Sequence, residues 1–429
     1  MRKIIYILLA VLTLCLIFQF YVCNYAKSMS NMILDSLKQN QNVVISNINQ
    51  SNGIFSQNLS FDLDTKDLFL SSISKENNES LKINVNLKSS YFLFSILNGI
   101  DINGTVEVIN PIDKKIISEI FGMNKPILIS ANTGLKSSNL DFKLQILPIN
   151  FQDEYSRLIS DKIIFDVSLN GNKISKISFF GDDIKFSQSG LFVQLLNLEY
   201  SISYPSEINF ADFDKYGIFD NNSKLNLSKV LVNSGLIGFN IDDISIISNL
   251  KTNNGIFDSN LNLDIKSLDS SGLSLNNINL ITSVSSIDME VCRYIIEAAT
   301  NNSSISDIEN KLLDIVKRDP KFDITNFSFE SKDGDKFAFD FSFWFDNARN
   351  MIKPKDILNY SNFTGNLITT NRLSSVSPWL LMTKSYEDYL IENGILIESG
   401  NGYKADFELS KNKDDIIFNS LVPLNSVLR

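Results

Sequence analysis

The sequence predicts a mainly β protein with a few helices, of the α+β class, in which one N-terminal transmembrane helix precedes an elongated antiparallel β body. Three observations predict this fold: an apolar run opens the chain, apolar and polar residues alternate with period two in many later segments, and few segments show helical periodicity. We expect four parts, which are a transmembrane anchor over residues 1–27, an amphipathic stalk over 28–45, a β-rich unit over 46–285, and a second β-rich unit with inserted helices over 286–429.

The anchor is predicted from the apolar run between Ile4 and Cys23, in which Thr13 and Gln19 are the only clearly polar residues. About 20 helical residues that rise ~1.5 Å each span ~30 Å, which is the thickness of the hydrocarbon core of a bilayer. This length is sufficient for one transmembrane helix.

Basic residues predict the orientation of the anchor. Arg2 and Lys3 precede the apolar run, whereas a lone Lys27 follows it. By the positive-inside rule the N-terminus stays in the cytoplasm and the chain after Asn24 is exported. A cleaved signal peptide is the competing interpretation, but Asn24-Tyr25-Ala26 is a poor small-x-small cleavage site and the apolar run is long for a signal peptide. We therefore expect an uncleaved anchor.

The stalk is predicted from Met29, Ile33 and Leu37, which fall on one face of a helix. This pattern indicates a short amphipathic continuation of the anchor out of the bilayer. A helical stalk is the simpler interpretation, and an amphipathic lipid sensor is the alternative.

Strands are predicted from strict alternation. Between residues 81 and 88, Leu81, Ile83, Val85 and Leu87 alternate with lysine and asparagine, so that one face is apolar and the other is polar. The segments 142–146, 261–265 and 337–345 show the same pattern. The turn Lys332-Asp333-Gly334-Asp335 predicts that the strand around Phe327 and Phe329 pairs with the strand over 337–345, because Asp-Gly supplies the positive φ angles of a tight hairpin.

Helices are expected over residues 287–299, 306–317 and 378–392. The second opens with the capping box Ser306-x-x-Glu309, and the third has Pro378 at its first helical position and ends at Asn393-Gly394. On the third helix we expect an apolar stripe to pack in the core, with a ligand site as the alternative. The members of this stripe are Trp379, Met382, Tyr386 and Tyr389.

A short internal similarity links two segments. Residues 52–63, which begin Asn-Gly-Ile-Phe, resemble residues 254–265, and 217–220 is a fainter copy. A duplicated β unit explains the similarity, and so does chance reuse of a favoured turn-then-strand pattern.

Four loosely defined stretches make the chain resemble the YdgA-like family of bacterial inner-membrane proteins of unknown function. They are Gly53-Ile54-Phe55-Ser56, the region from Val106 to Ile146 with its Phe121-Gly122 break, the region from Asp319-Pro320 to Phe345, and the C-terminal hairpin from Ala405 to Pro423. The family's final turn is replaced here by Lys411-Asn412-Lys413-Asp414, with Asn419-Ser420 after it. The resemblance implies an inner-membrane anchor, a periplasmic domain and a Gram-negative host, and it supplies no catalytic residues.

Composition excludes several classes of function. The chain has no histidine, so it lacks Ser-His and Cys-His nucleophile pairs and any histidine-ligated metal. The net charge of −10 and the absence of clustered cations argue against nucleic acid as a partner. The three cysteines, Cys15, Cys23 and Cys292, provide no disulfide framework.

Paired carboxylates are the remaining candidates for chemistry. They could serve a glycosidase or hold Ca²⁺, but none fits a calcium-binding loop, and solvated turns explain them more simply. The sequence predicts no catalytic residue, no cofactor and no metal site. The acids considered are Asp182-Asp183, Asp242-Asp243, Asp414-Asp415, Asp62-x-Asp64 with Asp67, and Asp333-Gly334-Asp335.

The expected function is that of a non-catalytic scaffold or binding protein, anchored by a single pass in the bacterial inner membrane with most of the chain in the periplasm. The membrane is the expected partner, and envelope proteins or lipid are further candidates. The apolar strand faces either pack on each other in a sandwich or form an open groove that binds a lipid or another hydrophobic ligand. An envelope hydrolase that uses carboxylates is the alternative from another class. Ligand and oligomeric state are not predicted.

Overall fold

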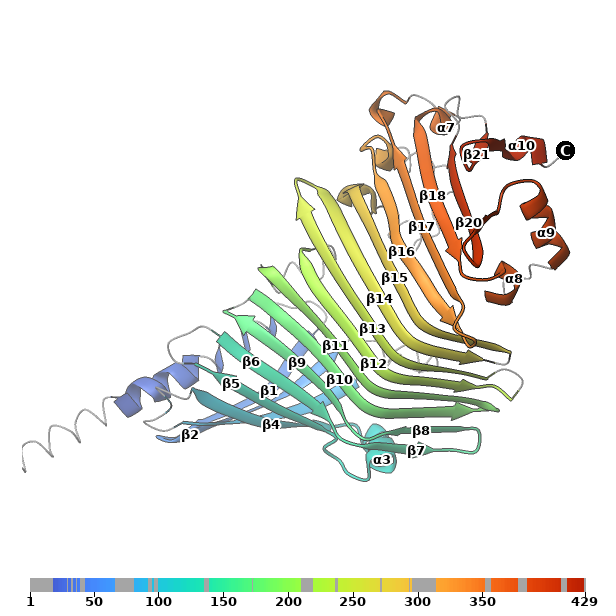
Figure 1. Ribbon diagram of the computed structural model, residues 1–429. Coiled ribbons are helices and arrows are strands. Elements are labelled where there is room, and N and C mark those ends of the chain that lie inside the picture. The colour runs from blue at the N-terminus through green and yellow to red at the C-terminus, as the bar shows by residue number, and fades with distance from the viewer. Residues whose placement is uncertain are drawn as a thin grey trace, which may run out of the picture. The chain divides into compact units, whose positions relative to one another are not determined.

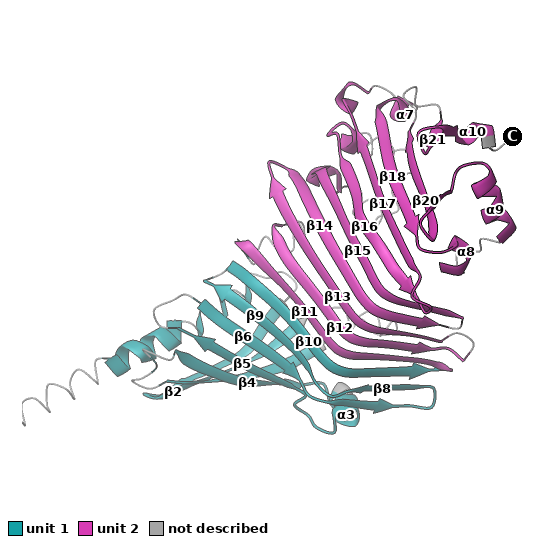
Figure 2. Ribbon diagram, in the orientation of Figure 1, with its two compact units in different colours: residues 1–189, 207–210 teal, residues 190–206, 211–429 magenta. Residues whose placement is uncertain are grey.

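The computed structural model describes residues 18–28, 30–31, 34–35, 37–38, 43–65, 81–91, 95, 99–134, 139–171, 173–209, 219–235, 238–270, 272–292, 294, 314–351, 356–376, 384–409 and 415–427. The chain divides into two compact units, residues 1–189 with 207–210 (unit 1) and residues 190–206 with 211–429 (unit 2) (Figure 2). Antiparallel strands dominate both units and helices are few (Figure 1), which confirms that the protein is mainly β and antiparallel, as predicted.

Unit 1 is built on antiparallel strands that pair largely in sequence order. From β1 to β6 each strand pairs with the next, β6 pairs with β9, and β9 pairs with β10. The helix α3 (Pro111–Phe121) connects β4 to β5. The strands are β1 (Val43–Asn52), β2 (Ser56–Thr65), β3 (Leu81–Ser90), β4 (Ile100–Val108), β5 (Ile127–Thr133), β6 (Asn139–Ile146), β7 (Ile149–Gln152), β8 (Ser156–Ser160), β9 (Ile163–Asn170) and β10 (Lys173–Gln188).

The strands β6 to β9 form one long interrupted hairpin. β6 pairs with β9, and β7 pairs with β8, so both arms break at the same level, after Ile146 on one arm and after Ser160 on the other. β10 runs past this break and pairs with β9 and then with β8. The predicted strands at 81–87 and 142–146 are confirmed as β3 and β6.

The segment that leads into β1 packs on the apolar face of unit 1. Leu34 is buried against Leu59, Phe61 and Val85, and Leu37 packs at the edge of the same cluster. The strand β1 already begins at Val43, within the predicted stalk. Met29 and Ile33, the other members of the predicted stripe, lie outside the described residues.

Residues 18–28 are helical. Val22 and Ala26 on this helix are buried against Tyr91, Ile100 and Ile102 of unit 1. Most of the predicted anchor, residues 1–17, lies outside the described residues. Among the residues that the structure describes, no helix has both the length and the apolar character needed to cross a bilayer.

Unit 2 continues the simple order. Each strand from β11 to β18 pairs antiparallel with the next, β18 pairs with β20, and β20 pairs with β19 and β21. The strands are β11 (Leu191–Asn209), β12 (Asn221–Asn233), β13 (Gly238–Asn253), β14 (Ile256–Ser270), β15 (Leu273–Asp288), β16 (Lys321–Ser331), β17 (Lys336–Phe345), β18 (Ser361–Thr369), β19 (Ile397–Ser399), β20 (Gly402–Leu409), β21 (Ile416–Phe418) and β22 (Val422–Pro423).

The strands predicted at 261–265 and 337–345 are confirmed as parts of β14 and β17, and the Asp333-Gly334 hairpin joins β16 to β17. The predicted boundary between residues 285 and 286 falls inside β15, where Val284 and Ser285 pair with β16 and Ile287 pairs with β14. No linker can occur at a position whose backbone is paired in this way, and the compact units divide near residues 189 and 190 instead.

The long strands of unit 2 bend at a line of residues with left-handed backbone conformations. Asn197 on β11, Asp243 on β13 and Asn277 on β15 have φ angles of 51°, 50° and 51°. Asp243 and Asn277 both lie opposite Lys266 of β14, as the flanking pairs show. Asparagine and aspartate are the non-glycine residues that best tolerate this conformation. Figure 1 shows the curvature of these strands.

The bend changes the spacing of core residues. In β15, Leu275 and Ile278 are both buried in one cluster although they are three residues apart, and Ile265 and Leu268 of β14 pack against the same cluster. In a regular strand, residues three apart point to opposite faces. The local change of direction therefore keeps both residues of each pair on the core side.

Within the described residues, the first predicted helix of unit 2 begins two residues later than expected, and the third ends at Glu392 as predicted. Ile287 and Asp288 belong to β15, and helical residues begin at Met289, because the strand pairing extends to the predicted helix start. Of the helix predicted over 306–317, residues 314–316 are described and helical. The remaining helical segments are η1 (Ala348–Asn350), α7 (Ile357–Tyr360), α8 (Leu373–Val376), α9 (Lys384–Glu392) and α10 (Leu424–Val427).

The two similar segments each contain a hairpin turn and the strand that follows it. Asn254 and Gly255, with φ angles of 50° and 80°, form the turn before β14, whereas Gly53, Ile54 and Phe55 lie between β1 and β2. Ile256 and Phe257 are paired strand residues, while Ile54 and Phe55 are exposed in their turn. The two copies thus use the same residues differently, and both explanations of the similarity stay open.

Candidate functional site

One face of the unit 2 sheet carries an uninterrupted row of apolar side chains. Directly paired residues on successive strands share a face of the sheet. The row contains no charged residue, and every member is partly exposed. We call it the apolar row; its members are Leu225, Ile246, Leu263, Leu280, Phe327, Phe339 and Leu367, from β12 to β18.

Aromatic rings extend the apolar row towards β20. Phe341 of β17 and Phe407 of β20 both pair with Gly365 of β18, which lies between them. Their ring centroids are 6.3 Å apart, and Phe339 lies 6.2 Å from Phe407. Phe363 contacts both Phe341 and Phe407 at centroid distances of 6.2 and 6.5 Å. These rings form a broad aromatic surface that is partly open to solvent.

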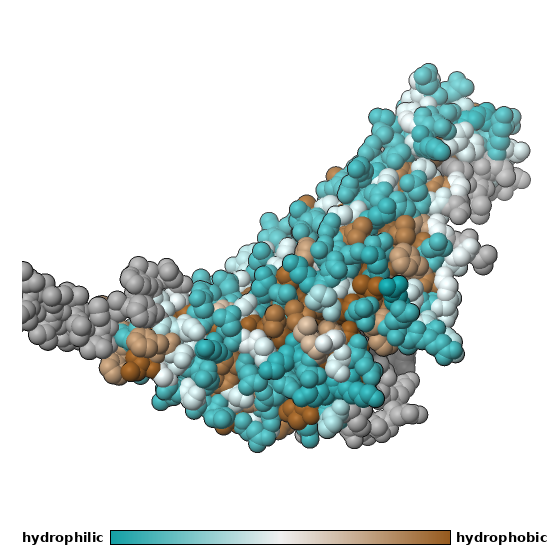
Figure 3. Space-filling model, turned by 90° about the horizontal axis from the view of Figure 1, so that it is seen from below, coloured by the Kyte–Doolittle hydropathy of each residue, from teal (hydrophilic) through white to brown (hydrophobic). Residues whose placement is uncertain are grey.

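Figure 3 shows hydrophobic side chains gathered on one side of the molecule and bordered by hydrophilic residues. The opposite face of the sheet is polar. Asn279 of β15 donates hydrogen bonds to Asn262 and Asp264 of β14, at 3.2 and 2.6 Å, and accepts one from Asn326 of β16. The sheet therefore separates a polar face, tied together by side-chain hydrogen bonds, from an apolar face.

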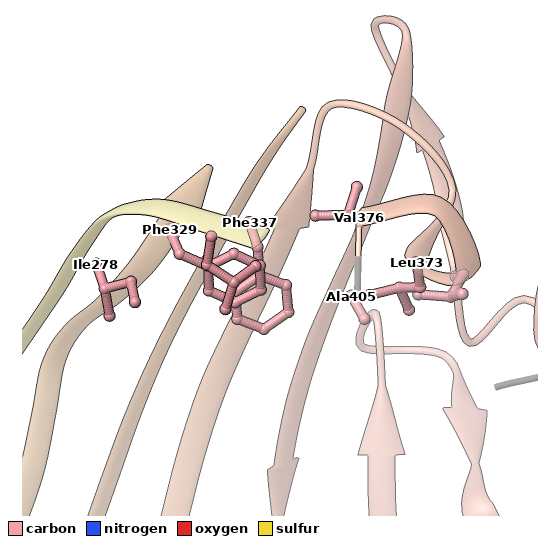
Figure 4. Packing of buried hydrophobic residues seen from close by; sticks show 8 residues of the cluster. Ile278, Phe329, Phe337, Leu373, Val376 and Ala405 are labelled. Atoms are coloured by element: carbon pink, nitrogen blue, oxygen red, sulfur yellow. The ribbon is translucent and has the colours of Figure 1, made fainter. Parts of the chain in front are cut away.

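Other elements of the described chain close the apolar face at two places. One is the C-terminal end of β17, where Phe345 packs against the buried residues Val316, Ala348 and Met351. The other is the opposite end of β17. There Leu275, Ile278, Phe329 and Phe337 of the sheet form one buried cluster with residues of α8 and of the segment after α9. Figure 4 shows Phe329 and Phe337 between Ile278 on one side and Leu373 and Val376 on the other. The rings of Phe329 and Phe337 stack with their centroids 4.7 Å apart. The covering residues are Leu373, Val376 and Leu396.

A buried carboxylate fixes this cover. Glu387 of α9 is fully buried and accepts hydrogen bonds from the backbone N–H of Leu373 at 2.5 Å and from the Ser374 hydroxyl at 2.6 Å. The carboxylate therefore satisfies a backbone donor in the first turn of α8, which has no intrahelical partner. This role is structural, because every described contact of the carboxylate lies within the cover.

The predicted core stripe on α9 is wrong in the part that the structure describes. Tyr386 and Tyr389 are 53% and 40% exposed, and their rings stack with centroids 6.3 Å apart on the outer side of the helix. Leu390 and Ile391 instead pack against the core cluster. The buried side of the helix therefore includes Glu387, whose carboxylate oxygens accept hydrogen bonds from Leu373 and Ser374. Trp379 and Met382 lie outside the described residues.

In the described part of the chain, the different acid pairs that the sequence offers as candidates do not come together in one site. Asp183 pairs with Lys185, Asp243 pairs with Lys266 at 3.1 Å, and Asp62 accepts hydrogen bonds from Asn47 and Asn84, both at 2.6 Å. Asp415 accepts hydrogen bonds from backbone N–H groups of Ile416 and Asn425, and Asp335 from Asn371. Asp67 and Asp414 lie outside the described residues. Within the described ranges, no three acidic or cysteine side chains come together as a metal site would require.

Asp340, on the polar face of unit 2, has a carboxyl group with a raised pKa. Asp340 and Asp406 both pair with Asn366, which lies between them. Partial burial, and then the negative charge of Asp406, raise the pKa of the Asp340 carboxyl. Its position on the polar face separates it from the apolar row.

Unit 1 carries a shallow cavity of about 710 Å³ across β1 to β6. Its lining is rich in amides and hydroxyls, including Asn49, Asn58, Asn86 and Asn103, and it contains one cation, Lys88. Asn84 and Asn86 of the same strand are hydrogen bonded to each other. The lining contains no carboxylate.

Comparisons with known proteins give no relative. The chain matches no family model, no curated protein and no solved structure. The resemblance to YdgA-like proteins therefore stays a prediction.

Proposed function

We propose that this chain is a membrane-anchored protein of the bacterial cell envelope that binds the fatty acyl chains of lipids on the apolar row of unit 2. The observation that carries the proposal is the row itself, which is uncharged, partly exposed and uninterrupted from Leu225 to Leu367. The protein acts by binding rather than by catalysis.

The dimensions of the row suit acyl chains. Neighbouring strands lie ~4.8 Å apart, so the row from β12 to β18 is about 30 Å long. An acyl chain occupies half of a bilayer core, or ~15 Å. Each methylene group that the row removes from water contributes ~0.8 kcal/mol, so that even partial burial of a chain suffices for binding.

A sandwich was the other use expected for this face. Its partner would be a second sheet, but in unit 2 the described cover consists of short helical segments and loops. They are α8, α9 and the segment after α9 at the end of the face that includes Phe329 and Phe337, and the residues around Val316, η1 and α7 at Phe345. The aromatic surface around Phe341 and Phe407 stays partly open. This arrangement favours the open groove over the closed sandwich.

The sequence supports the proposed location. The run from Ile4 to Cys23 is long enough to cross a bilayer, and the basic residues Arg2 and Lys3 favour a cytoplasmic N-terminus. The proposal therefore places the N-terminal segment in the inner membrane as a single pass, and units 1 and 2 in the periplasm. An acyl-binding surface tethered to a membrane lies close to its source of lipid.

Mass spectrometry of lipids retained by the full-length protein after detergent purification and extensive washing tests the proposal. We expect stoichiometric lipid on the wild type and its loss in Leu263→Asp, which places a charge in the apolar row. The matched control Asn260→Asp places the same charge at an exposed position on the polar face of the same strand and should retain lipid. A lipid-free wild type, or equal retention by the two variants, would overturn the proposal.

A further inference from the structure

We propose that the turn between β1 and β2 is a second membrane contact, in which Ile54 and Phe55 enter the bilayer interface beside the anchor helix. This inference rests on the membrane anchor of the proposed function. It adds a second contact with the bilayer, which would fix the distance of unit 1 from the membrane surface and its orientation.

The turn is attached to the helix by hydrogen bonds. Gln19 Nε2 donates to the carbonyl oxygen of Ile54 at 2.7 Å, and the Gln19 side chain is buried. Tyr91, which contacts Cys23 of the helix at 3.5 Å, donates its hydroxyl to the carbonyl oxygen of Gly53 at 2.8 Å. Because Val22 and Ala26 are also buried against unit 1, the turn and the helix form one packed body.

Large apolar side chains on both elements are exposed. Ile54 and Phe55 are 61% and 56% exposed, and on the helix Phe20 and Tyr21 are 65% and 56% exposed. Phe18 is 43% exposed. Single exposed apolar residues are common on soluble surfaces, but five of them on two hydrogen-bonded elements indicate a contact surface.

The occupant of this surface follows from the chain that precedes it. Residues 4–17 are apolar apart from Thr13 and lead directly into Phe18, so a bilayer that holds them must end close to this point. On the exposed side of the helix, Tyr21 is followed by the exposed residues Asn24 and Lys27. Tyrosine favours the interface and lysine the headgroup region, so the interface falls near Tyr21.

The hydrogen bond from Gln19 places the turn at this level. Residues in a helix rise ~1.5 Å each, so Gln19 lies ~3 Å further towards the bilayer than Tyr21 along the helix axis. Ile54, which is bonded to Gln19, therefore lies at the interface or slightly within it. Phe55 follows directly and is exposed.

The backbone of the turn is suited to an apolar environment. The carbonyl oxygens of Gly53 and Ile54 accept hydrogen bonds from Tyr91 and Gln19, and that of Phe55 accepts one from the backbone N–H of Tyr91 at 3.0 Å. Unpaired backbone groups are costly in a membrane, and these carbonyls are already paired. The turn between Asn52 and Ser56 also carries no charged residue.

Tryptophan quenching by brominated phospholipid tests the inference on the full-length chain reconstituted in phosphatidylcholine vesicles. In a Trp344→Phe, Trp379→Phe background, single tryptophans are placed by Phe20→Trp, Ile54→Trp or Tyr155→Trp. Tyr155 is the matched control, because it is 68% exposed in the turn between β7 and β8, another hairpin of unit 1. Circular dichroism of each variant shows whether the sheet has formed.

We expect loss of most of the fluorescence at positions 20 and 54, and none at position 155. Quenching at position 20 without quenching at position 54 would overturn the inference and leave the anchor intact. Absence of quenching at both positions would contradict the anchor itself. Equal quenching at all three positions would overturn the inference as well, because the contact would not be specific to the β1–β2 turn.

Discussion

Phe341 and Phe407 stack their rings across Gly365, although the two phenylalanines lie on strands that are not neighbours in the sheet. The missing side chain of the glycine leaves the space that the Phe407 ring occupies, and a Cβ at this position would lie 2.7 Å from Cε2 of Phe407. The glycine thereby joins the aromatic residues of β17 and β20 into one surface.

Gly365→Ala should displace the Phe407 ring and destabilise the protein by about 1–3 kcal/mol, the usual cost of overpacking. Urea unfolding measures the change. Gly238→Ala is the control, because its Cβ would meet only the Val232 carbonyl oxygen at 3.6 Å, and it should change stability much less. Equal stability of the two variants would contradict the role assigned to Gly365.

The bend of the long strands depends on residues that accept a positive φ angle. Asn277→Val should be less stable than Asn277→Gly by about 1–2 kcal/mol, because a β-branched residue is strained in this conformation and glycine is not. Both variants lose the hydrogen bond from Asn277 to Glu330 at 2.8 Å, so their difference in urea unfolding isolates the backbone effect. If valine were tolerated as well as glycine, the left-handed conformation at this position would be in error.

The cover over Phe329 and Phe337 depends on Glu387. Glu387→Ala leaves the buried backbone N–H of Leu373 and the hydroxyl of Ser374 without their acceptor, and should cost about 2–4 kcal/mol of stability. Thermal or urea unfolding provides the measurement. Glu392→Ala, at an exposed position of the same helix, should have little effect. A similar cost for both substitutions would show that Glu387 contributes only helix propensity.

Asp340 should make the stability of unit 2 depend on pH. Its pKa is raised in the folded state by burial and by Asp406, so the native state holds the proton more tightly than the unfolded state. The corresponding stability is fully present below the unfolded pKa of about 3.9 and is lost as the pH rises through the folded pKa. Asp340→Asn should therefore raise the Tm at pH 7, and the gain should shrink as the pH falls towards 3.

Asp333→Asn, in the exposed turn between β16 and β17, serves as the control for that pH series. It accounts for the general effect of removing one surface carboxylate. A pH-independent effect of Asp340→Asn would contradict the raised pKa.

Alternation in the sequence was sufficient to predict several of the strands. The patterns at 81–87 and 337–345 became β3 and β17, and the Asp-Gly turn gave the correct hairpin between β16 and β17. Alternation does not predict where a strand bends. At a bend, a residue with left-handed backbone conformation, such as Asn277, changes the spacing of buried residues from two to three. The pairs Leu275 and Ile278, and Ile265 and Leu268, follow this spacing of three. This spacing is the feature of the sequence from which the bend could have been predicted.

The candidate site was predictable only in part. Alternation shows that a strand has an apolar face, but whether another layer covers that face depends on contacts distant in sequence. Helical periodicity also failed on α9, where Tyr386 and Tyr389 are exposed while the buried face includes Glu387. A carboxylate can be buried there because Leu373 and Ser374 satisfy it, and these partners lie more than ten residues away.

The central claim is that acyl chains lie on the apolar row, and photo-crosslinking tests it most directly. Cells that express the full-length protein would be fed a fatty acid with a photoreactive diazirine in its tail, irradiated, and the modified peptides mapped by mass spectrometry. We predict adducts on apolar-row residues such as Leu263, Leu280 and Phe339. Adducts confined to residues 1–28, or none at all in a protein that is present and folded, would contradict the claim.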